Sequence, residues 1–485
     1  MSRPMVETKP KHDVIVVGAG PAGLACSTEL VGLGVSVAVV DEQGEPGGNI
    51  YRNVTHLSAQ QRKVLGLDYT IGRELVEAFL AAAPDYLPRA HVWQAEATGN
   101  VCLSQNGKSR KLHAAYLVLS TGAMERPVPF PGWTLPGVMT CGGMSNLYKV
   151  SGLIPSDPVV LAGSGPLLWL VAEHLFVMGA PIAAILDTST RKGAASAARH
   201  LPGALGRLGY MMKGLGMMAA VKRAAKENKT PIYRDVKNLR AEGGERLGKV
   251  RATSGTQDLC FDVATLLVHE GVIPETALLR QAGCAHRWNP VQRYWHADVA
   301  ADGRTNLPSV FVAGDGAFVH GAKSAQLKGQ RTALSIAREL GRLSEVEFRS
   351  RVGSVSKELD KELRPRPFID ALYAPRGDLF HVADDTIVCR CEGVAAGRIR
   401  EVARTGVVDP NEIKSIIRCG MGPCQGRMCG SAVLELAVEA SGVAAEQIRA
   451  LRQRPPIKPI SLEELAAADL DVVSPRAGRA DEETR

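Results

Sequence analysis

The chain has 485 residues, more than one hydrophobic core usually supports, so we expect two to four domains. Hydrophobic residues make up 45% and charged residues 22%, which is typical of a globular enzyme. The formal net charge of +8 is modest for this length and is not gathered into a basic run with interleaved aromatic residues, so the composition does not favour nucleic-acid binding.

The N-terminal residues 1–12 lack the apolar core of a secretory signal, so we expect a flexible arm on a cytoplasmic protein. Residues 159–186 are apolar over a length that could cross a membrane. Gly163, Gly165 and Pro166 interrupt this segment. The pattern therefore favours a buried strand, a tight turn and a helix over a membrane span.

A β-branched run at residues 13–17 leads directly into the glycine motif GAGPAG, with Gly18, Gly20 and Gly23. In a strand–turn–helix unit, the first glycine allows the turn, the second lets the backbone approach a pyrophosphate and the third permits close packing of helix on strand. The start of the helix then offers unpaired N–H groups to the diphosphate. This motif predicts a dinucleotide site.

The following strand ends in two acidic residues, Asp41 and Glu42. A carboxylate at this position accepts hydrogen bonds from a ribose hydroxyl group and repels a 2′-phosphate, so the site favours FAD or NAD over NADP. Asp41 is the first candidate for this contact because it comes directly at the strand end, and Glu42 is the second.

Three later segments add candidate residues for the same cofactor. They are the turn GEPGGNIYR, the strand end STGA and the strand end VFVAGDG. The residues are Gly47, Gly48, Thr121, Gly122, Gly314 and Asp315. The segments resemble the signatures of flavoproteins with two dinucleotide-binding domains, in which the last aspartate binds the ribityl chain of FAD. The resemblance covers residues 13 to about 335 and implies an α/β fold with a Rossmann-like FAD domain and an inserted second Rossmann-like domain; a Rossmann fold without flavin is the alternative.

A second unit opens at Gly163 and Gly165, but Leu168 stands where a third glycine is expected. In related reductases the inserted domain binds NAD(P)H. A leucine at this position would crowd the helix against the strand, and the only carboxylate suited to a ribose is Asp187. The sequence therefore leaves NAD(P) binding open.

No residue can be assigned a catalytic role from spacing. Neither glycine motif carries a nearby C-x-x-C pair, which excludes disulfide exchange. No nucleophile, acid or base constellation is visible, and we expect His269, Glu270, His286 and His320 to have structural roles.

Residues 191–229 are rich in Lys, Arg and Met. Such a segment could lie on an anionic membrane surface, on the inner face of the membrane, or could bind a partner subunit. We prefer a helical excursion whose methionines pack into the protein, because Gly214 and Gly216 interrupt the helix.

Four cysteines near the C-terminus, Cys389, Cys391, Cys424 and Cys429, form two pairs with 32 residues between them. Thiolates are soft ligands that select iron–sulfur clusters, zinc or copper(I). The first pair is C-x-C, whereas zinc knuckles generally use C-x₂₋₄-C. The spacing therefore favours a [2Fe-2S] cluster, with zinc and [4Fe-4S] as alternatives.

The segments CRCEGV and GMGPCQGRMCG resemble the bacterioferritin-associated-ferredoxin-like [2Fe-2S] domain. This resemblance implies that the four cysteines named above ligate the cluster, and it gives Cys419 only the role of a small buried residue. Many members of that family have two residues inside the second pair, whereas this chain has four. The longer spacing is associated with fused flavoprotein subunits.

The whole chain, from residue 13 to about 465, resembles the larger subunit of heteromeric flavin dehydrogenases, which include opine oxidases, proline and hydroxyproline dehydrogenases and hydrogen cyanide synthase. The residues that carry this resemblance lie in LLVHEGVIPET, AGDGAFVHGAKSAQ and LRQRPPIKPI. The resemblance implies FAD and a [2Fe-2S] cluster in this chain, a partner subunit similar to D-amino-acid oxidase, and a quinone or other acceptor. Further options are an FMN at the interface with the partner and a small third subunit.

The function implied is electron transfer from the C–N bond of an amino acid, imino acid or opine, oxidised mainly on the partner subunit. A self-contained NAD(P)H-dependent reductase is the alternative, and an iron-release or binding module with a vestigial flavin frame is a third. The expected segments are a flexible arm (1–12), the first part of the FAD-binding domain (13–150), an inserted NAD(P)-like domain (151–260), the second part of the FAD-binding domain (261–345), a connector (346–383), the helical [2Fe-2S] domain (384–445) and a tail (446–485).

Overall fold

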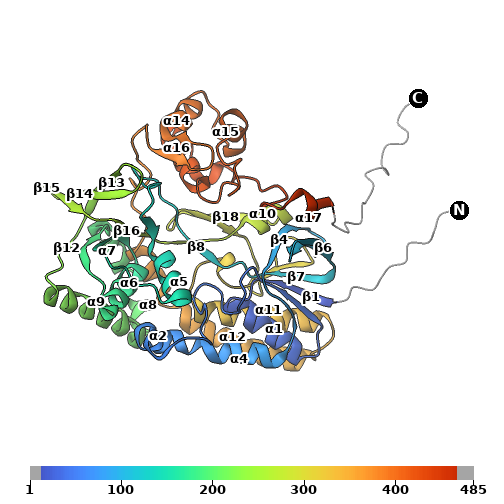
Figure 1. The fold of residues 1–485 in the computed structure, drawn as a ribbon. Helices are drawn as coiled ribbons and strands as arrows, with labels where there is room; N and C mark the ends of the chain where they lie inside the picture. Colours follow the sequence, from blue (N-terminus) through green and yellow to red (C-terminus); the bar gives the residue numbers. More distant parts are fainter. Residues whose placement is uncertain (1–11, 467–485) are drawn as a thin grey trace, which may run out of the picture.

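Two five-stranded parallel sheets organise the chain in a computed structural model that describes residues 12–466 (Figure 1). A small helical unit lies above them, on the same side as strands β8 (Ala123–Glu125) and β18 (His286–Asn289) (Figure 1). The expected arm, except for its last residue, and the end of the expected tail lie outside the described residues.

The first sheet combines strands from distant parts of the chain, in the order β20-β7-β1-β2-β3. Its strands are β1 (His12–Val17), β2 (Val37–Val40), β3 (Asp85–Leu87), β7 (Ala114–Leu119) and β20 (Val310–Val312). The central strand β1 is buried on both faces, which explains its run of Val and Ile. Helices α1 (Pro21–Gly32), α4 (Gly72–Ala82) and α11 (Ala322–Glu339) cover one face. The small sheet of β4 (Ala90–Ala95), β5 (Val101–Gln105) and β6 (Lys108–Leu112) lies on the other.

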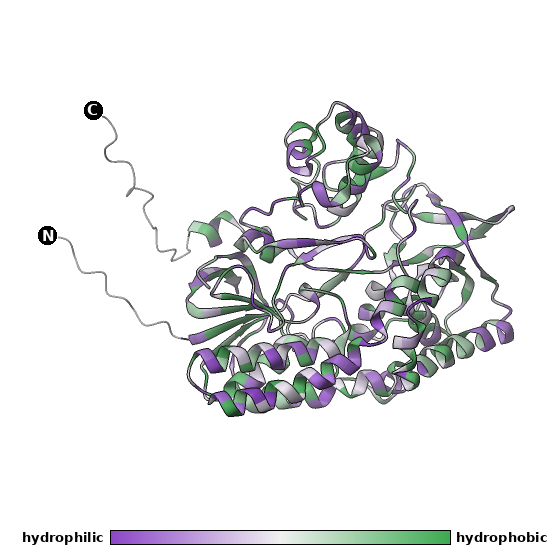
Figure 2. Ribbon diagram, turned by 180° about the vertical axis from the view of Figure 1, so that it is seen from behind, coloured by the Kyte–Doolittle hydropathy of each residue, from purple (hydrophilic) through white to green (hydrophobic). Residues whose placement is uncertain are grey.

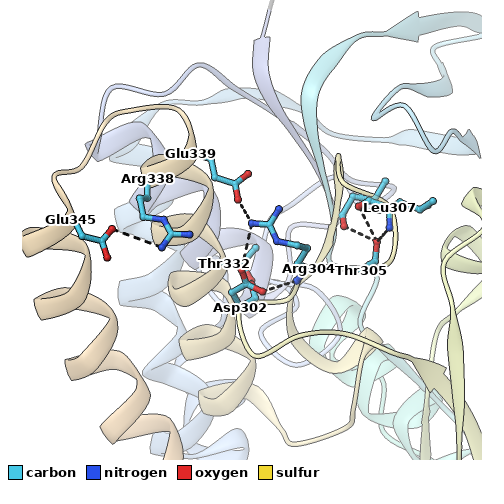
Figure 3. A network of polar contacts seen from close by, with 9 residues as sticks. Asp302, Arg304, Thr305, Leu307, Thr332, Arg338, Glu339 and Glu345 are labelled. Atoms are coloured by element: carbon cyan, nitrogen blue, oxygen red, sulfur yellow. Dashed lines mark hydrogen bonds and ion pairs between the residues drawn. The ribbon is translucent and has the colours of Figure 1, made fainter.

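Helix α11 is held to the loop before β20 by a polar network (Figure 3). Arg304 forms ion pairs with Asp302 and Glu339, and the Thr332 hydroxyl donates to the Asp302 carbonyl at 2.9 Å. Near the end of α11, the guanidinium group of Arg338 lies 4.0 Å from the carboxylate of Glu345, the first residue of α12 (Glu345–Leu363). These contacts fix α11 relative to the last strand of the sheet.

The second sheet has the order β12-β11-β10-β16-β9. Its strands are β9 (Val138–Thr140), β10 (Val159–Ser164), β11 (Ile182–Asp187), β12 (Ile232–Tyr233) and β16 (Thr265–Glu270). Helices α5 (Cys141–Ser151), α6 (Pro166–Met178) and α9 (Leu208–Glu227) cover one face. The antiparallel strands β13 (Val236–Gly243), β14 (Leu247–Ser254) and β15 (Gln257–Asp262) cover the other. Strands β9 and β16 lie outside the expected inserted segment 151–260 yet pair within this sheet, so the sheet extends beyond those boundaries.

Leu168, at the position of the missing third glycine, does not crowd the helix. Its side chain is fully buried in the core beneath α6, together with Leu161 of β10 and Leu267 of β16. A leucine fits here because α6 packs on this sheet through side chains rather than through direct backbone contact.

The expected connector forms two helices, α12 and α13 (Arg366–Leu372), with the bend at the RPRP segment. The helical unit that follows consists of a short hairpin and three helices. They are β21 (Ile387–Cys389), β22 (Val394–Ala395), α14 (Ala396–Arg404), α15 (Pro410–Ile417) and α16 (Gly430–Ser441). Short elements complete the described chain: α2 (Ala59–Leu65), α3 (Leu67–Thr70), α7 (Arg191–Ala198), α8 (Leu201–Leu205), β17 (Val272–Pro274), α10 (Ala277–Ala282), β19 (Tyr294–Ala297) and α17 (Leu462–Ala466).

The expectation for the Met-rich segment is wrong in one respect. Helix α9 continues without interruption through Gly214 and Gly216. Met217 and Met218 pack partly against the second core, but Met212 is exposed to solvent. Among residues 12–466, no helix has both the length and the hydropathy needed to cross a membrane.

Replacing Leu168 by Ala should destabilise the second unit by about 2–5 kcal/mol, because the substitution removes buried methyl groups and leaves a cavity. Denaturation followed by circular dichroism should show a lower midpoint. The matched control is Leu67→Ala on exposed α3, which should leave the midpoint unchanged within error. Equal shifts in both variants would contradict the placement of Leu168 in the core.

Candidate cofactor sites

In the glycine loop between β1 and α1, neighbouring backbone segments lie too close together for a side chain to fit between them. Gly18 has φ +104°, and a Cβ atom there would lie 2.5 Å from the Ser120 carbonyl oxygen. A Cβ atom at Gly23 would lie 1.8 Å from the Gly18 carbonyl oxygen. Helix α1 begins after Gly20 with no side chain capping its first N–H groups. These free donors face the position that a pyrophosphate takes in such a loop.

Asp41 and Glu42 differ sharply in their surroundings. Asp41 is 8% exposed and accepts hydrogen bonds from the backbone N–H groups of Ala19 and Gln43. Burial raises the pKa of its carboxyl group, although these hydrogen bonds oppose the shift. The Glu42 side chain is 46% exposed and forms an ion pair with Lys458. The geometry therefore favours Asp41 as the ribose contact, next to the glycine loop.

The turn that carries Gly47 and Gly48 lies directly over the glycine loop. The Gly47 N–H donates to the Ala19 carbonyl at 2.8 Å. Gly48 has φ +62°, and a Cβ atom there would lie 2.8 Å from the Cα atom of Gly20. The two loops thus form a cradle of bare backbone that a side chain would fill, which fits the passage of a dinucleotide.

Lys149 of α5 forms hydrogen bonds with the backbone that follows this turn. Its ammonium group donates to the carbonyls of Asn49 and Ile50 at 2.9 and 3.1 Å. Burial lowers the pKa of Lys149 to about 7, with a further contribution from Arg52. No sequence motif pointed to this lysine, because its role depends on packing between α5 and a turn 100 residues earlier.

The remaining predicted residues lie at the carboxyl ends of β7 and β20. The Thr121 hydroxyl donates to the Glu275 carbonyl at 2.9 Å, and the Glu275 N–H donates to the Gly122 carbonyl at 3.0 Å. A Cβ atom at Gly314 would lie 2.6 Å from the Cβ atom of Ala22 in α1.

Asp315 directly follows this glycine, and one of its carboxylate oxygens accepts a hydrogen bond from the His320 N–H at 2.9 Å. Since β1, β2, β7 and β20 are parallel strands of one sheet, all the proposed FAD residues gather along one edge.

Five cysteines gather at the end of the helical unit that carries β21. The Sγ atoms of Cys389, Cys419 and Cys429 lie within 4.8 Å of one another. Cys391 and Cys424 form a second close pair beside them, linked by a hydrogen bond. Hydrogen bonds from Cys419 and Cys429 lower the pKa of Cys389 to about 2, so this group is disposed to be a thiolate. The donor set fits an iron–sulfur cluster.

Cys419 is the residue whose position the sequence-based interpretation missed. It lies beside two of the proposed ligands, so this part of the chain holds one thiol more than a cluster with four thiolate ligands needs. A signal was present in the sequence, because Cys419, Cys424 and Cys429 follow one another at equal intervals of five residues. The assignment of Cys389, Cys391, Cys424 and Cys429 as ligands remains a prediction.

The chain after α16 forms a strap (residues 451–458) that joins the two sites. Leu451 packs so closely on the cysteine loop that a Cβ atom at Gly426 would lie 2.1 Å from its Cδ2 atom. At the other end, the Ile457 N–H donates to the Trp93 carbonyl at 3.0 Å, and Lys458 pairs with Glu42 beside the proposed ribose site.

A small cavity of about 60 Å³ lies between the proposed flavin site and the cysteine loop. Glu275 and Arg280 line it from the first side, and Gly426 and Arg427 line it from the second. Glu275 is the residue that contacts both Thr121 and Gly122. Residues next to both proposed cofactor sites therefore line the same cavity.

The corresponding edge of the second sheet is arranged differently. The His269 ring lies beside the turn before α6, where its Nε2 atom would be 3.2 Å from a Cβ atom at Gly165, and its Nδ1 atom pairs with Glu125 at 2.7 Å. Helix α13 covers the neighbouring edge, since a Cβ atom at Gly193 would lie 2.8 Å from the Leu372 carbonyl oxygen. The connector thus packs against α7, beside a cavity of about 520 Å³ at the strand ends.

The other polar residues noted in the sequence do not form one site. Glu270 accepts a hydrogen bond from Thr188 at 2.9 Å, and burial raises the pKa of its carboxyl group. The His286 ring contacts the carbonyl of Cys284 at 2.8 Å, and burial lowers the pKa of this histidine to about 4. These contacts support structural roles.

Comparison with known families decides the identity of these sites. Residues 12–337 match the family model of pyridine nucleotide-disulphide oxidoreductases. This chain belongs to that family. Residues 387–439 match the BFD-like [2Fe-2S] binding domain. The cofactors are therefore FAD and a [2Fe-2S] cluster, the chain is an oxidoreductase, and the expected fold class is confirmed.

Relatives of similar length place the chain more closely. It is 40% identical over 465 residues to the A subunit of opine oxidase from Agrobacterium tumefaciens (strain Ach5), covering 94% of this chain and 91% of the relative. It is 31% identical to hydrogen cyanide synthase subunit HcnB of Pseudomonas protegens, covering 94% and 98%. The structure of L-proline dehydrogenase from P. horikoshii has a similar fold, with a TM-score of 0.68 at 20% identity, covering 94% of this chain and 79% of that one. The expected family resemblance is confirmed.

Replacing Gly48 by Ala should weaken FAD binding by at least about tenfold, because the new Cβ atom meets the backbone of Gly20 in addition to the strain of a positive φ. Flavin content after gel filtration and titration of the stripped protein with FAD measure the effect. Gly34→Ala is the matched control, since Gly34 also has positive φ but has no atom within reach. Equal FAD losses in both variants would show that the cradle is not the binding site.

Replacing Cys424 by Ser should abolish or strongly alter the cluster, because a hydroxyl group poorly replaces a thiolate. Cys419→Ser should leave it intact, and the exposed Cys260→Ser serves as the control. Acid-labile sulfide and the EPR signal of the reduced protein are the measurements. A cluster lost in the Cys419 variant but kept in the Cys424 variant would reverse the ligand assignment.

Proposed function

We propose that this chain is the electron-accepting subunit of a heteromeric dehydrogenase that oxidises the C–N bond of an amino acid, an imino acid or an opine. One observation carries the proposal: a cavity of about 60 Å³ is lined both by Glu275, which contacts two of the proposed flavin residues, and by Gly426 and Arg427 of the cysteine loop. The names of the relatives, which are subunits of an oxidase and of a synthase, support the same function.

Two cofactors of different electron capacity suit this task. A bound flavin takes up two electrons and can release them singly, whereas a [2Fe-2S] cluster carries one. The loop after β17 contributes Glu275 beside the flavin residues, and Arg427 lies between two of the proposed cluster ligands. Both residues line the same cavity, so this chain's own residues connect the surroundings of the two sites.

Substrate oxidation is assigned to a second subunit. Among the described residues, the polar groups of the flavin edge serve to hold backbone turns, as Asp41, Thr121, Lys149 and Asp315 do. None of these contacts leaves an arginine and a base arranged around an open substrate position. We propose a partner similar to D-amino-acid oxidase, in a complex that further includes an FMN at the interface and a small third subunit.

The self-contained NAD(P)H reductase is less well supported. It would need a dinucleotide along the second sheet, where His269 lies against the turn before α6 and α13 covers the adjoining edge. Tyr373, next to α13, approaches the candidate ribose contact Asp187, and its burial together with this carboxylate raises the pKa of Tyr373 to about 12.

The isolated chain should oxidise neither amino acids nor NADH, whereas the complex with its copurifying partner should turn over one of the substrate class. Proline, hydroxyproline, glycine and opines are assayed with an artificial one-electron acceptor, and flavin bleaching is followed in parallel. A complex that contains Cys424→Ser should lose acceptor reduction more than flavin reduction by substrate. Ready NADH turnover by the chain alone would replace this proposal with the reductase.

A further inference from the structure

Helix α9 presents an apolar stripe to solvent. Leu208, Met212 and Leu215 follow the helical spacing i, i+4, i+7 and are 57%, 58% and 58% exposed. The opposite face of the helix carries Val221 and Ala225, which are buried against the second sheet. The stripe therefore points away from the protein core, and intramolecular packing does not account for it.

Neighbouring elements extend this apolar surface. Leu201 and Leu205 of α8 are exposed, and so is Leu67 of α3. An ion pair between Lys213 and Asp68 brings α3 next to α9. Figure 2 shows hydrophobic and hydrophilic residues sharing the helices along the lower edge of the molecule, where α8 and α9 lie. We call Leu67, Leu201, Leu205, Leu208, Met212 and Leu215 the apolar patch.

Basic residues continue the stripe toward the end of the helix. Lys222, Arg223 and Lys226 lie on the same exposed side as Leu208 and Leu215, and none of the three has an ion pair with any residue in the range 12–466. Residues 192–229 contain eight lysines and arginines and one acidic residue, Glu227. An uncompensated positive charge thus borders the apolar patch.

We propose that α8 and α9 bind the surface of an anionic membrane. Amphipathic helices of this kind place their apolar side chains at the boundary of headgroups and acyl chains, and each nearby lysine or arginine adds attraction to anionic lipids. A bilayer surface needs no matching shape, which suits a patch spread over three elements. A protein partner would have to supply acidic groups opposite these cations as well as a complementary apolar surface.

The orientation that follows is specific. Helices α14 to α16 lie on the opposite side of the body from α8 and α9 (Figure 1). A chain bound through the apolar patch therefore carries its cluster on the aqueous side. The electron acceptor of the cluster would then approach from water rather than from within the bilayer.

The test uses the complete holo chain and sedimentation with vesicles of phosphatidylcholine, with and without phosphatidylglycerol. Binding should require phosphatidylglycerol and weaken as salt is added. The triple variant Lys222→Gln, Arg223→Gln, Lys226→Gln should bind roughly a hundredfold more weakly. The variant Leu208→Ser, Met212→Ser, Leu215→Ser should lose at least about tenfold while keeping the positive charge.

The matched control removes three exposed charges elsewhere, with Lys108→Gln, Arg110→Gln and Arg404→Gln, and should bind as the wild type does. Flavin content of every variant establishes that it is folded. Absence of binding to phosphatidylglycerol vesicles at low salt, or equal losses in the control, overturns the proposal. If the serine variant binds vesicles normally but no longer copurifies with its partner, the patch is an interface between subunits and the membrane proposal is wrong.

Discussion

Direct contact between backbones at the start of α1 is the constraint on which the flavin-binding half depends. The turn before this helix meets the strand end at Ser120 and the turn at Gly48 at distances that leave no room for a further side chain. The side chain of Ala22, inside the helix, meets the loop at Gly314. In the first turn of the helix, the Ala22 carbonyl oxygen would lie 2.1 Å from a Cβ atom at Gly329 of α11. Three segments, at Ser120, Gly48 and Gly329, therefore meet the start of the helix through backbone atoms, which leaves the first N–H groups of α1 uncovered by side-chain caps.

In the second sheet, the corresponding helix α6 does not contact the strands directly through its backbone. With Leu168 in the helix, α6 packs on the sheet through side chains, and a cavity of about 520 Å³ lies at the strand ends, lined by residues such as Thr188 and Glu270. His269 and Glu125 form a buried pair there, and Glu125 also accepts the N–H of Gly142 at 2.8 Å. Two sheets of the same parallel kind thus carry different residues at their strand ends.

Local sequence patterns predict most of the proposed FAD-binding residues, because each of these residues lies in a turn or at a strand end that has a recognisable motif. Gly18, Asp41 and Gly314 could be found independently, and parallel strand order then brings them together. Lys149 and Lys458 could not be found in this way, since their contacts with Asn49 and Glu42 join residues 100 or more positions apart. The sequence predicts an interruption of the helix at Gly214 and Gly216, but α9 is continuous. Two glycines lower helix stability only modestly, and the burial of Val221 and Ala225 outweighs this loss.

Cys419 illustrates a different limit. The family motif identifies the four recurring cysteines, but it does not predict that a fifth, Cys419, lies beside two of them. Only the folded loop, which curls through Gly420 and Gly426 with positive φ, brings Cys419 against Cys389 and Cys429.

The strap also bears on how the protein is made. As the ribosome delivers the chain, β1 and α1 emerge first, but β20 completes their sheet only after about 300 more residues. Lys458 and Leu451, which close the ribose side of the flavin site and the back of the cysteine loop, come later still. Both proposed sites therefore stay open until the strap has been synthesised, which gives cofactors a period of access before the strap packs against them.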